Sequence, residues 1–138
     1  MILALRLLFT FVLVFMLGII TWASSRCALF DIPREVFTHP WFIATLFDAY
    51  LAFVAFWVWV AWKEGTVAAC VLWLIAILLW GNPAIALYML IELARAKRDG
   101  GGLDAVFAAK RPGAITLPAI LTTLGIAVYL LGAKNVLF

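Results

Sequence analysis

One acidic side chain, Asp48, lies inside a long apolar run and is the residue best placed to do chemistry. The run extends from Trp41 to Trp62 and contains no other charged residue. As a helix it would be about 33 Å long, which is enough to cross a bilayer. A carboxylate about 10 Å below the end of that helix costs a few kcal/mol unless it finds a proton or polar partners. Proton or cation binding is the chemistry that Asp48 would support.

Four other polar residues are expected in the same half of the protein: Asn82, Thr122, Thr123 and Tyr88. Counting helix rise from the predicted helix ends places Asp48 about 10 Å, Asn82 about 15 Å and the threonines about 10 to 12 Å from one face. Such an intramembrane cluster would be a half-channel, a proton or cation site, or the polar end of a ligand pocket. Alternatively, it would be an interhelical hydrogen bond that sets helix register. With one acid and no buried base, the sequence favours the structural interpretation and leaves the functional one open.

Most other site chemistries lack the residues they need. His39 is the only histidine, so no zinc or di-iron ligand pattern is present and no metal is predicted. Cys27 and Cys70 are expected at opposite faces, too far apart for a disulfide. There is no serine triad or phosphate-binding loop, and residues 100–102 form a glycine linker. We therefore predict no catalytic residues and no enzyme activity.

Composition makes lipid the expected solvent of this chain. The sequence is 68% hydrophobic and 12% charged, with a mean hydropathy of +1.18. A soluble domain of 138 residues has no room to bury so much apolar surface. The net charge of +3 suggests anionic lipid headgroups as the counter-surface, and nucleic acid is not an expected partner.

The predicted fold class is all-α, an integral membrane four-helix bundle that forms one domain over residues 1–138. The predicted spans are residues 3–24, 41–62, 67–92 and 114–133. The third is long for a bilayer, and Gly81-Asn82-Pro83 is expected to kink it. A short interfacial helix is expected near residues 103–110.

Small and amphipathic residues mark the predicted contacts of these spans. We predict helix packing at three alanines on the same helix face as Asp48 (Ala44, Ala52 and Ala55) and at two glycines (Gly18 and Gly125). Interfacial positions are assigned to Trp22, Trp41, Trp62, His39, Lys110 and Arg111.

The distribution of basic residues predicts an orientation for four spans. The first and third connections, 24–40 and 94–113, hold seven lysines and arginines, against three near the termini and the second turn (Arg6, Lys63 and Lys134). The positive-inside rule then places both connections in the cytoplasm and both termini outside. A bacterial inner membrane is the expected location.

The central half of the chain resembles a known family. The pattern Trp41…Thr45-Leu-Phe-Asp48-Ala-Tyr50…Trp62-Lys63-Glu64, followed by Gly81-Asn82 and Tyr88, is similar to small bacterial and plant membrane proteins of uncharacterised function. The resemblance implies a multi-span membrane protein with the aspartate and the asparagine as its polar marks. It implies no activity.

Three functions follow as hypotheses. The favoured one is a non-enzymatic accessory or scaffold subunit that packs against other membrane protein subunits and the lipid bilayer. The second is a small oligomeric transporter or channel with Asp48 as its proton or cation site. The third is a binder of a lipid-soluble cofactor such as quinone or carotenoid, or of a lipid, although no cofactor is required by the sequence.

Overall fold

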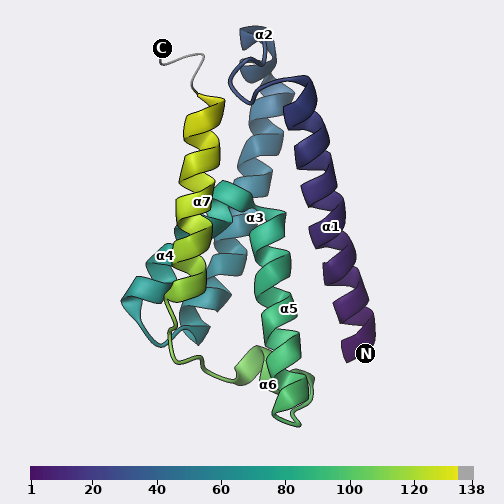
Figure 1. Ribbon diagram of the computed structural model, residues 1–138, viewed down its shortest axis with the longest axis vertical. Helices are drawn as coiled ribbons and strands as arrows, with labels where there is room; N and C mark the ends of the chain where they lie inside the picture. The colour runs from purple at the N-terminus through teal and green to yellow at the C-terminus, as the bar shows by residue number, and fades with distance from the viewer. Residues whose placement is uncertain (134–138) are drawn as a thin grey trace.

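The computed structural model describes residues 1–133, and its regular secondary structure there is entirely α-helical (Figure 1). The helices are α1 (Ile2–Arg26), α2 (Arg34–Phe37), α3 (Pro40–Lys63), α4 (Val67–Trp80), α5 (Asn82–Arg98), α6 (Leu103–Ala108) and α7 (Thr116–Gly132). The all-α prediction is confirmed. Lys134, which the charge count placed near the C-terminus, lies outside the described residues.

Two of these helices are long and apolar enough to cross a membrane. They are α1, with a mean hydropathy of 2.6, and α3, with 1.8. Pro40 begins α3 at a position where its missing N–H costs no helical hydrogen bond. The two other apolar helices, α4 and α7, are shorter, with 14 and 17 residues.

The third predicted span, 67–92, is wrong, because the chain turns back at Gly81. Gly81 has φ of +59° and ψ of −129°, a backbone conformation open to glycine alone among ordinary residues. Pro83 then lies in the first turn of α5, where proline starts a helix and does not kink one. The rings of Trp73 and Tyr88, on either side of the turn, pack edge to face with centroids 4.9 Å apart. Helices α4 and α5 therefore form a helical hairpin.

The hairpin brings the third connection to the same end of the molecule as the second turn (Figure 1). Two contacts show this: Lys63 Nζ lies 2.5 Å from Glu92 Oε2, and Arg6 Nη2 donates to the Leu93 carbonyl at 2.9 Å. We call this end, with Met1, the 64–66 turn and the 99–115 connection, the base. The opposite end, with the 27–39 connection, α2 and the end of α7, is the top.

This arrangement corrects the predicted topology. Connections 24–40 and 94–113 do not share a face, because α5 returns to the base where a continuous third span would have reached the top. The described chain likewise begins at the base and ends, at Ala133, at the top. The longest helices are α1 and α3, with 25 and 24 residues, whereas α7 lies toward the top and the hairpin occupies the lower half.

Helix α7 runs alongside α4 in the same direction. Thr122 donates to the Leu72 carbonyl at 3.2 Å, and Tyr129, two turns higher, donates to the Leu79 carbonyl at 3.2 Å. Gly125 lies between them, and a Cβ there would come within 2.8 Å of Leu79 Cδ1. The absence of a side chain at Gly125 is what lets the two helices approach closely.

Candidate functional site

Five side chains form a buried polar cluster at the base of the molecule, which we call the base cluster. Its members are Lys63, Glu64, Tyr88, Glu92 and Arg111. They come from the end of α3, the turn after it, the lower half of α5 and the segment that leads to α7. Two acids face two bases, so the formal charges of the cluster cancel.

The most buried pair in the cluster joins α3 to α5. The side chain of Lys63 is 0% exposed and that of Glu92 is 4% exposed, and the two are in ionic contact. Lys63 Nζ also donates to the Val106 carbonyl, so α6 is tied to the same ammonium group. A charge this deep is tolerated only when paired and hydrogen-bonded, and here both conditions are met for Lys63.

Arg111 connects the two acids. Its Nη1 lies 3.1 Å from Glu64 Oε1 and its Nε lies 3.2 Å from Glu92 Oε1, while the guanidinium stacks over the Tyr88 ring at 4.8 Å. The Tyr88 hydroxyl donates to Glu64 Oε1 at 3.1 Å. Although Arg111 lies close to both acids, its Nη1 makes no hydrogen bond within residues 1–133. Glu64 Oε2 also has no hydrogen-bond partner among these residues.

The base cluster holds four segments of the chain together. Breaking one of its pairs would leave a buried charge uncompensated, so the cluster fixes how the hairpin sits against α3 and the connection to α7. Within the described residues there is no group of three or more histidine, cysteine, aspartate or glutamate side chains that could hold a metal ion. The arrangement is suited to structural anchoring.

The sequence does not predict this cluster, because each member has a local interpretation. Lys63 and Glu64 follow an apolar run, as in a turn between helices, and Glu92 stands at the end of the predicted span 67–92. Arg111 was placed among lipid headgroups, yet its side chain is only 8% exposed. A signal was present: charges of opposite sign stand at the ends of consecutive apolar runs. Only the reversal at Gly81 brings those ends together.

The predicted intramembrane cluster is not assembled in this structure. Tyr88 belongs to the base cluster, Thr122 bonds the Leu72 carbonyl, and Thr123 bonds the Ala119 carbonyl of its own helix. Asp48 and Asn82 are both exposed, and neither side chain has a hydrogen bond or ion pair within residues 1–133. The predicted cluster requires the end of the third span, at Glu92, to lie at the same face as the start of the second span. Glu92 lies at the base, whereas Asp48 lies in the upper half of α3.

The predicted small-residue stripe lies on the outer surface of α3. Ala44, Asp48, Ala52 and Ala55 are all exposed, and we call them the α3 face. Gly18 of α1 is also exposed, with nothing within 4 Å of the place its Cβ would occupy. Of the predicted packing residues, only Gly125 contacts another helix closely within the described chain.

The predicted interfacial residues lie near the two ends of the molecule. Trp22, Trp41 and Trp62 are 61%, 78% and 50% exposed. His39 is the N-cap of α3, where its Nδ1 accepts a hydrogen bond from the Trp41 N–H at 3.3 Å. Lys110 lies over the Trp62 ring at 3.8 Å, a cation–π contact at the base. Both cysteines are free.

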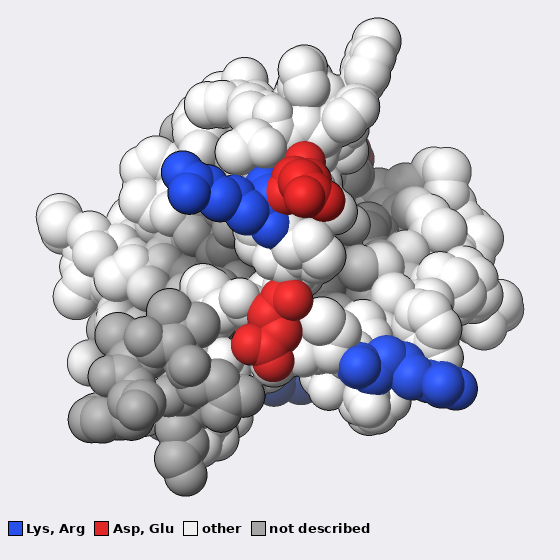
Figure 2. Space-filling model, turned by 90° about the horizontal axis from the view of Figure 1, so that it is seen from above, with Lys and Arg blue, Asp and Glu red and all other residues white. Residues whose placement is uncertain are grey.

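Charge is distributed unequally between the two ends. Figure 2 looks onto the top, where a few charged side chains of both signs stand among uncharged ones. The top holds Arg26, Arg34, Asp31 and Glu35. Most lysines and arginines of the described chain belong to the base half: Arg6, Lys63, Arg95, Lys97, Arg98, Lys110 and Arg111.

The fold and the site define a small all-α protein with two helices long and apolar enough to span a membrane. Over residues 1–115 the chain matches a family described as protein of unknown function (DUF1475), and it belongs to that family. The match includes α1 to α6 and every member of the base cluster, and so extends beyond the central half in which the resemblance was seen. No curated protein and no solved structure matches the chain.

Proposed function

We propose that this protein is an accessory or scaffold subunit that binds a helix of a larger membrane protein through the α3 face. The observation that carries the proposal is the exposure of Asp48. It lies about 12 Å of helix rise beyond Pro40, and within residues 1–133 its carboxylate has no polar partner. In hydrocarbon such a group costs a few kcal/mol, a cost that a partner's basic or hydrogen-bonding side chain removes.

The alanines around Asp48 support a helix as the partner. Ala44, Ala52 and Ala55 extend the face over about 16 Å of helix, and each contributes only a methyl group to it. Small residues let two helix backbones approach, which strengthens van der Waals packing where no hydrophobic effect drives association. A donor on the partner helix at the depth of Asp48 would complete the contact.

We further propose how the chain sits in the membrane. Helices α1, α3 and α7 cross it, and the α4–α5 hairpin enters from the base and returns at about half depth. The turn at Gly81 is shielded by Phe53, whose ring packs against it, as backbone at membrane depth requires. Among residues 1–133, seven basic residues lie in the base half and two at the top, which supports a cytoplasmic base by the positive-inside rule.

Co-purification from native membranes in mild detergent tests the proposal. Asp48→Leu removes the polar contact and Ala52→Trp obstructs the face, so each should reduce the recovered partner at least tenfold. Tenfold corresponds to about 1.4 kcal/mol, within the range of one interhelical hydrogen bond. The control is Val54→Trp, because Val54 is 38% exposed on another side of α3 and should leave recovery unchanged. A wild-type protein that is recovered alone would overturn the proposal.

One observation favours a second candidate, a small oligomeric transporter or channel. The tip of the α4–α5 hairpin lies below the upper ends of the long helices, and Asn82 is exposed at this tip. Interrupted helices near mid-membrane often form ion or substrate sites. Asp48→Asn separates the candidates because it keeps hydrogen bonding but abolishes titration. A transporter would lose proton or cation flux in liposomes, whereas a scaffold subunit would keep its partner. Unchanged flux through Asp48→Asn would rule out the transporter hypothesis.

A further inference from the structure

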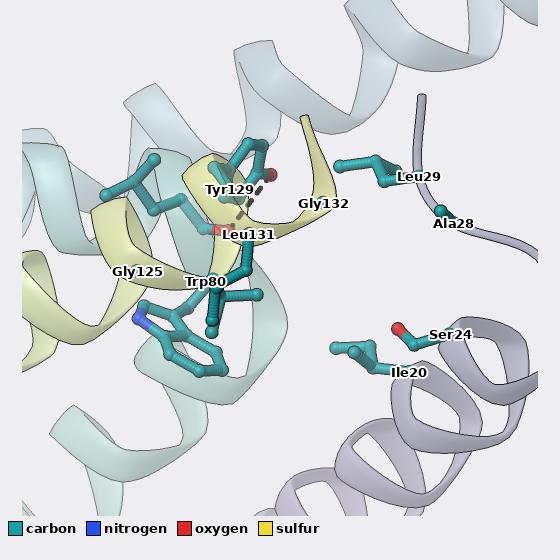
Figure 3. A pocket seen from close by; sticks show the side chains of 11 residues that line it. Ile20, Ser24, Ala28, Leu29, Trp80, Gly125, Tyr129, Leu131 and Gly132 are labelled. Atoms are coloured by element: carbon teal, nitrogen blue, oxygen red, sulfur yellow. Dashed lines mark hydrogen bonds between the residues drawn. The ribbon is translucent and has the colours of Figure 1, made fainter. Parts of the chain in front are cut away.

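A cavity of about 430 Å³ lies in the upper half of the molecule, between α1 and α7 (Figure 3). Its size is within the range of small-molecule sites. Residues from the end of α1, the end of α4, the upper half of α7 and the loop after α1 line it, among them Ile20, Ser24, Leu29, Trp80, Tyr129 and Leu131. None of these residues belongs to the α3 face or the base cluster.

The cavity exists because the hairpin is short. Helix α4 ends at Trp80, beside Gly125, while α7 continues to Gly132. That leaves about 10 Å of α7 above the hairpin tip. The cavity is lined by the upper parts of α1 and α7, whereas in the lower half the hairpin packs against both helices. Unfilled space costs the lining its dispersion contacts, so an occupant would be stabilising.

The chemistry of the wall selects an apolar occupant. The Tyr129 hydroxyl donates to the Leu79 carbonyl at 3.2 Å, and Trp80 Nε1 donates to the Leu121 carbonyl at 2.8 Å, so both donors are already used (Figure 3). Ser24 places a hydroxyl at the α1 side, and the rest of the wall is predominantly hydrocarbon. A polar molecule would lose hydration here without replacement hydrogen bonds. Water is disfavoured for the same reason.

The opening of the cavity leads to apolar surroundings. Val128 and Leu131, which line it, are 50% and 74% exposed, and Ile19 on α1 beside it is 43% exposed. Because these outward surfaces are themselves suited to lipid, a hydrocarbon chain could enter sideways from the bilayer without crossing a polar barrier.

A positive charge lies close in sequence to the cavity lining, at the end of α1. Arg26 lies in the last turn of α1, between the lining residues Ser24 and Ala28, is exposed, and makes no ion pair within the described residues. A guanidinium at the level of the headgroups is complementary to a phosphate. We propose that the cavity binds one acyl chain of an anionic phospholipid, with the lipid phosphate at Arg26.

Native mass spectrometry of the purified full chain tests the proposal with dioleoyl phosphatidylglycerol and dioleoyl phosphatidylcholine as probes. We expect one phosphatidylglycerol retained per chain. Val128→Phe fills the cavity from α7 and Ile20→Phe fills it from α1, and each should reduce retention at least fivefold. The matched control is Val58→Phe, because Val58 is 59% exposed on α3 and lies outside the cavity. Arg26→Gln should abolish the preference for phosphatidylglycerol while phosphatidylcholine still binds, and Arg34→Gln should preserve it.

The outcomes separate the parts of the proposal. Equal retention by Val128→Phe, Ile20→Phe and Val58→Phe would overturn the assignment of the lipid to this cavity. In the contrary outcome, an equimolar isoprenoid quinone displaces the phospholipid from the wild-type protein and fails to bind the cavity-filling variants. That result would overturn the phospholipid as the occupant. The test does not depend on the α3 face, since Asp48→Leu should retain the lipid whether or not a protein partner is lost.

Discussion

The Lys63–Glu92 contact concentrates two opposite charges where almost no solvent reaches them. Both side chains are under 5% exposed, and Arg111 supplies a second positive charge to the same carboxylate. Buried ion pairs add little net stability over apolar residues of similar size, but they are costly to break on one side only. The value of the pair therefore lies in specifying which parts of α3, α5 and α6 meet.

Removing one member of this pair should destabilise the protein strongly. Glu92→Leu leaves the Lys63 ammonium buried without its carboxylate, for which we expect a loss of about 3 to 5 kcal/mol in the free energy of unfolding. The double variant Lys63→Met, Glu92→Leu should recover much of this loss, because Arg111 and Glu64 still pair. Titration with a denaturing detergent measures the change.

The exposed pair Arg98–Asp99 provides the matched control. Its side chains are 75% and 65% exposed, so Asp99→Asn should change stability by only about 0 to 1 kcal/mol. If Glu92→Leu were no more harmful than Asp99→Asn, the base cluster would not hold the segments together.

At the scale of elements, the reversal at Gly81 decides the path of the chain. The turn needs a positive φ, and a Cβ there would lie 2.9 Å from Phe53 Cζ. The ring can shift more easily than the backbone, so the conformation of Gly81 is the stronger of the two constraints. Asn82 and Pro83 then start α5 in the opposite direction.

Gly81→Ala should destabilise the hairpin by about 1 to 3 kcal/mol through backbone strain. Gly18→Ala is the control, because Gly18 is helical and has open space around it, so the change should be neutral or stabilising by up to about 1 kcal/mol. Detergent unfolding again gives the readout. Phe53→Leu in the Gly81→Ala background should recover only the part of the loss that comes from the ring. A neutral Gly81→Ala would contradict the assigned turn.

At the scale of the whole molecule, the hairpin sets which connections share a side. Cys27 lies in the top connection and Asp99 in the base connection. A membrane-impermeant thiol reagent should therefore modify Cys27, and a cysteine introduced at position 99, from opposite sides of a sealed membrane. With the base in the cytoplasm, Cys27 should be modified in intact cells.

The matched pair of proteins would carry one cysteine each. The first has Cys70→Ala and keeps Cys27, and the second has Cys27→Ser, Cys70→Ala and Asp99→Cys. The second should be modified only after the membrane is opened. Modification of both from the same side would instead support a continuous third span and contradict the hairpin.

The local features of this chain can be predicted from its sequence. The lengths of the apolar runs predict α1 and α3 to within two residues at each end, because hydropathy acts locally along the chain. The short helix after the glycine linker was also expected near its observed place, Leu103–Ala108. The family resemblance rested on similarly local patterns and was confirmed.

Tertiary structure alone decided the direction of α5 and everything that depends on it. An apolar run with Gly-Asn-Pro near its middle is compatible with a kink or a reversal, and hydropathy does not distinguish the two signs of φ at Gly81. The reversal joins Glu92 to Lys63, opens the cavity above the hairpin tip and leaves Asp48 on the outer surface. These contacts depend on which distant ends meet, and packing energy between helices determines that.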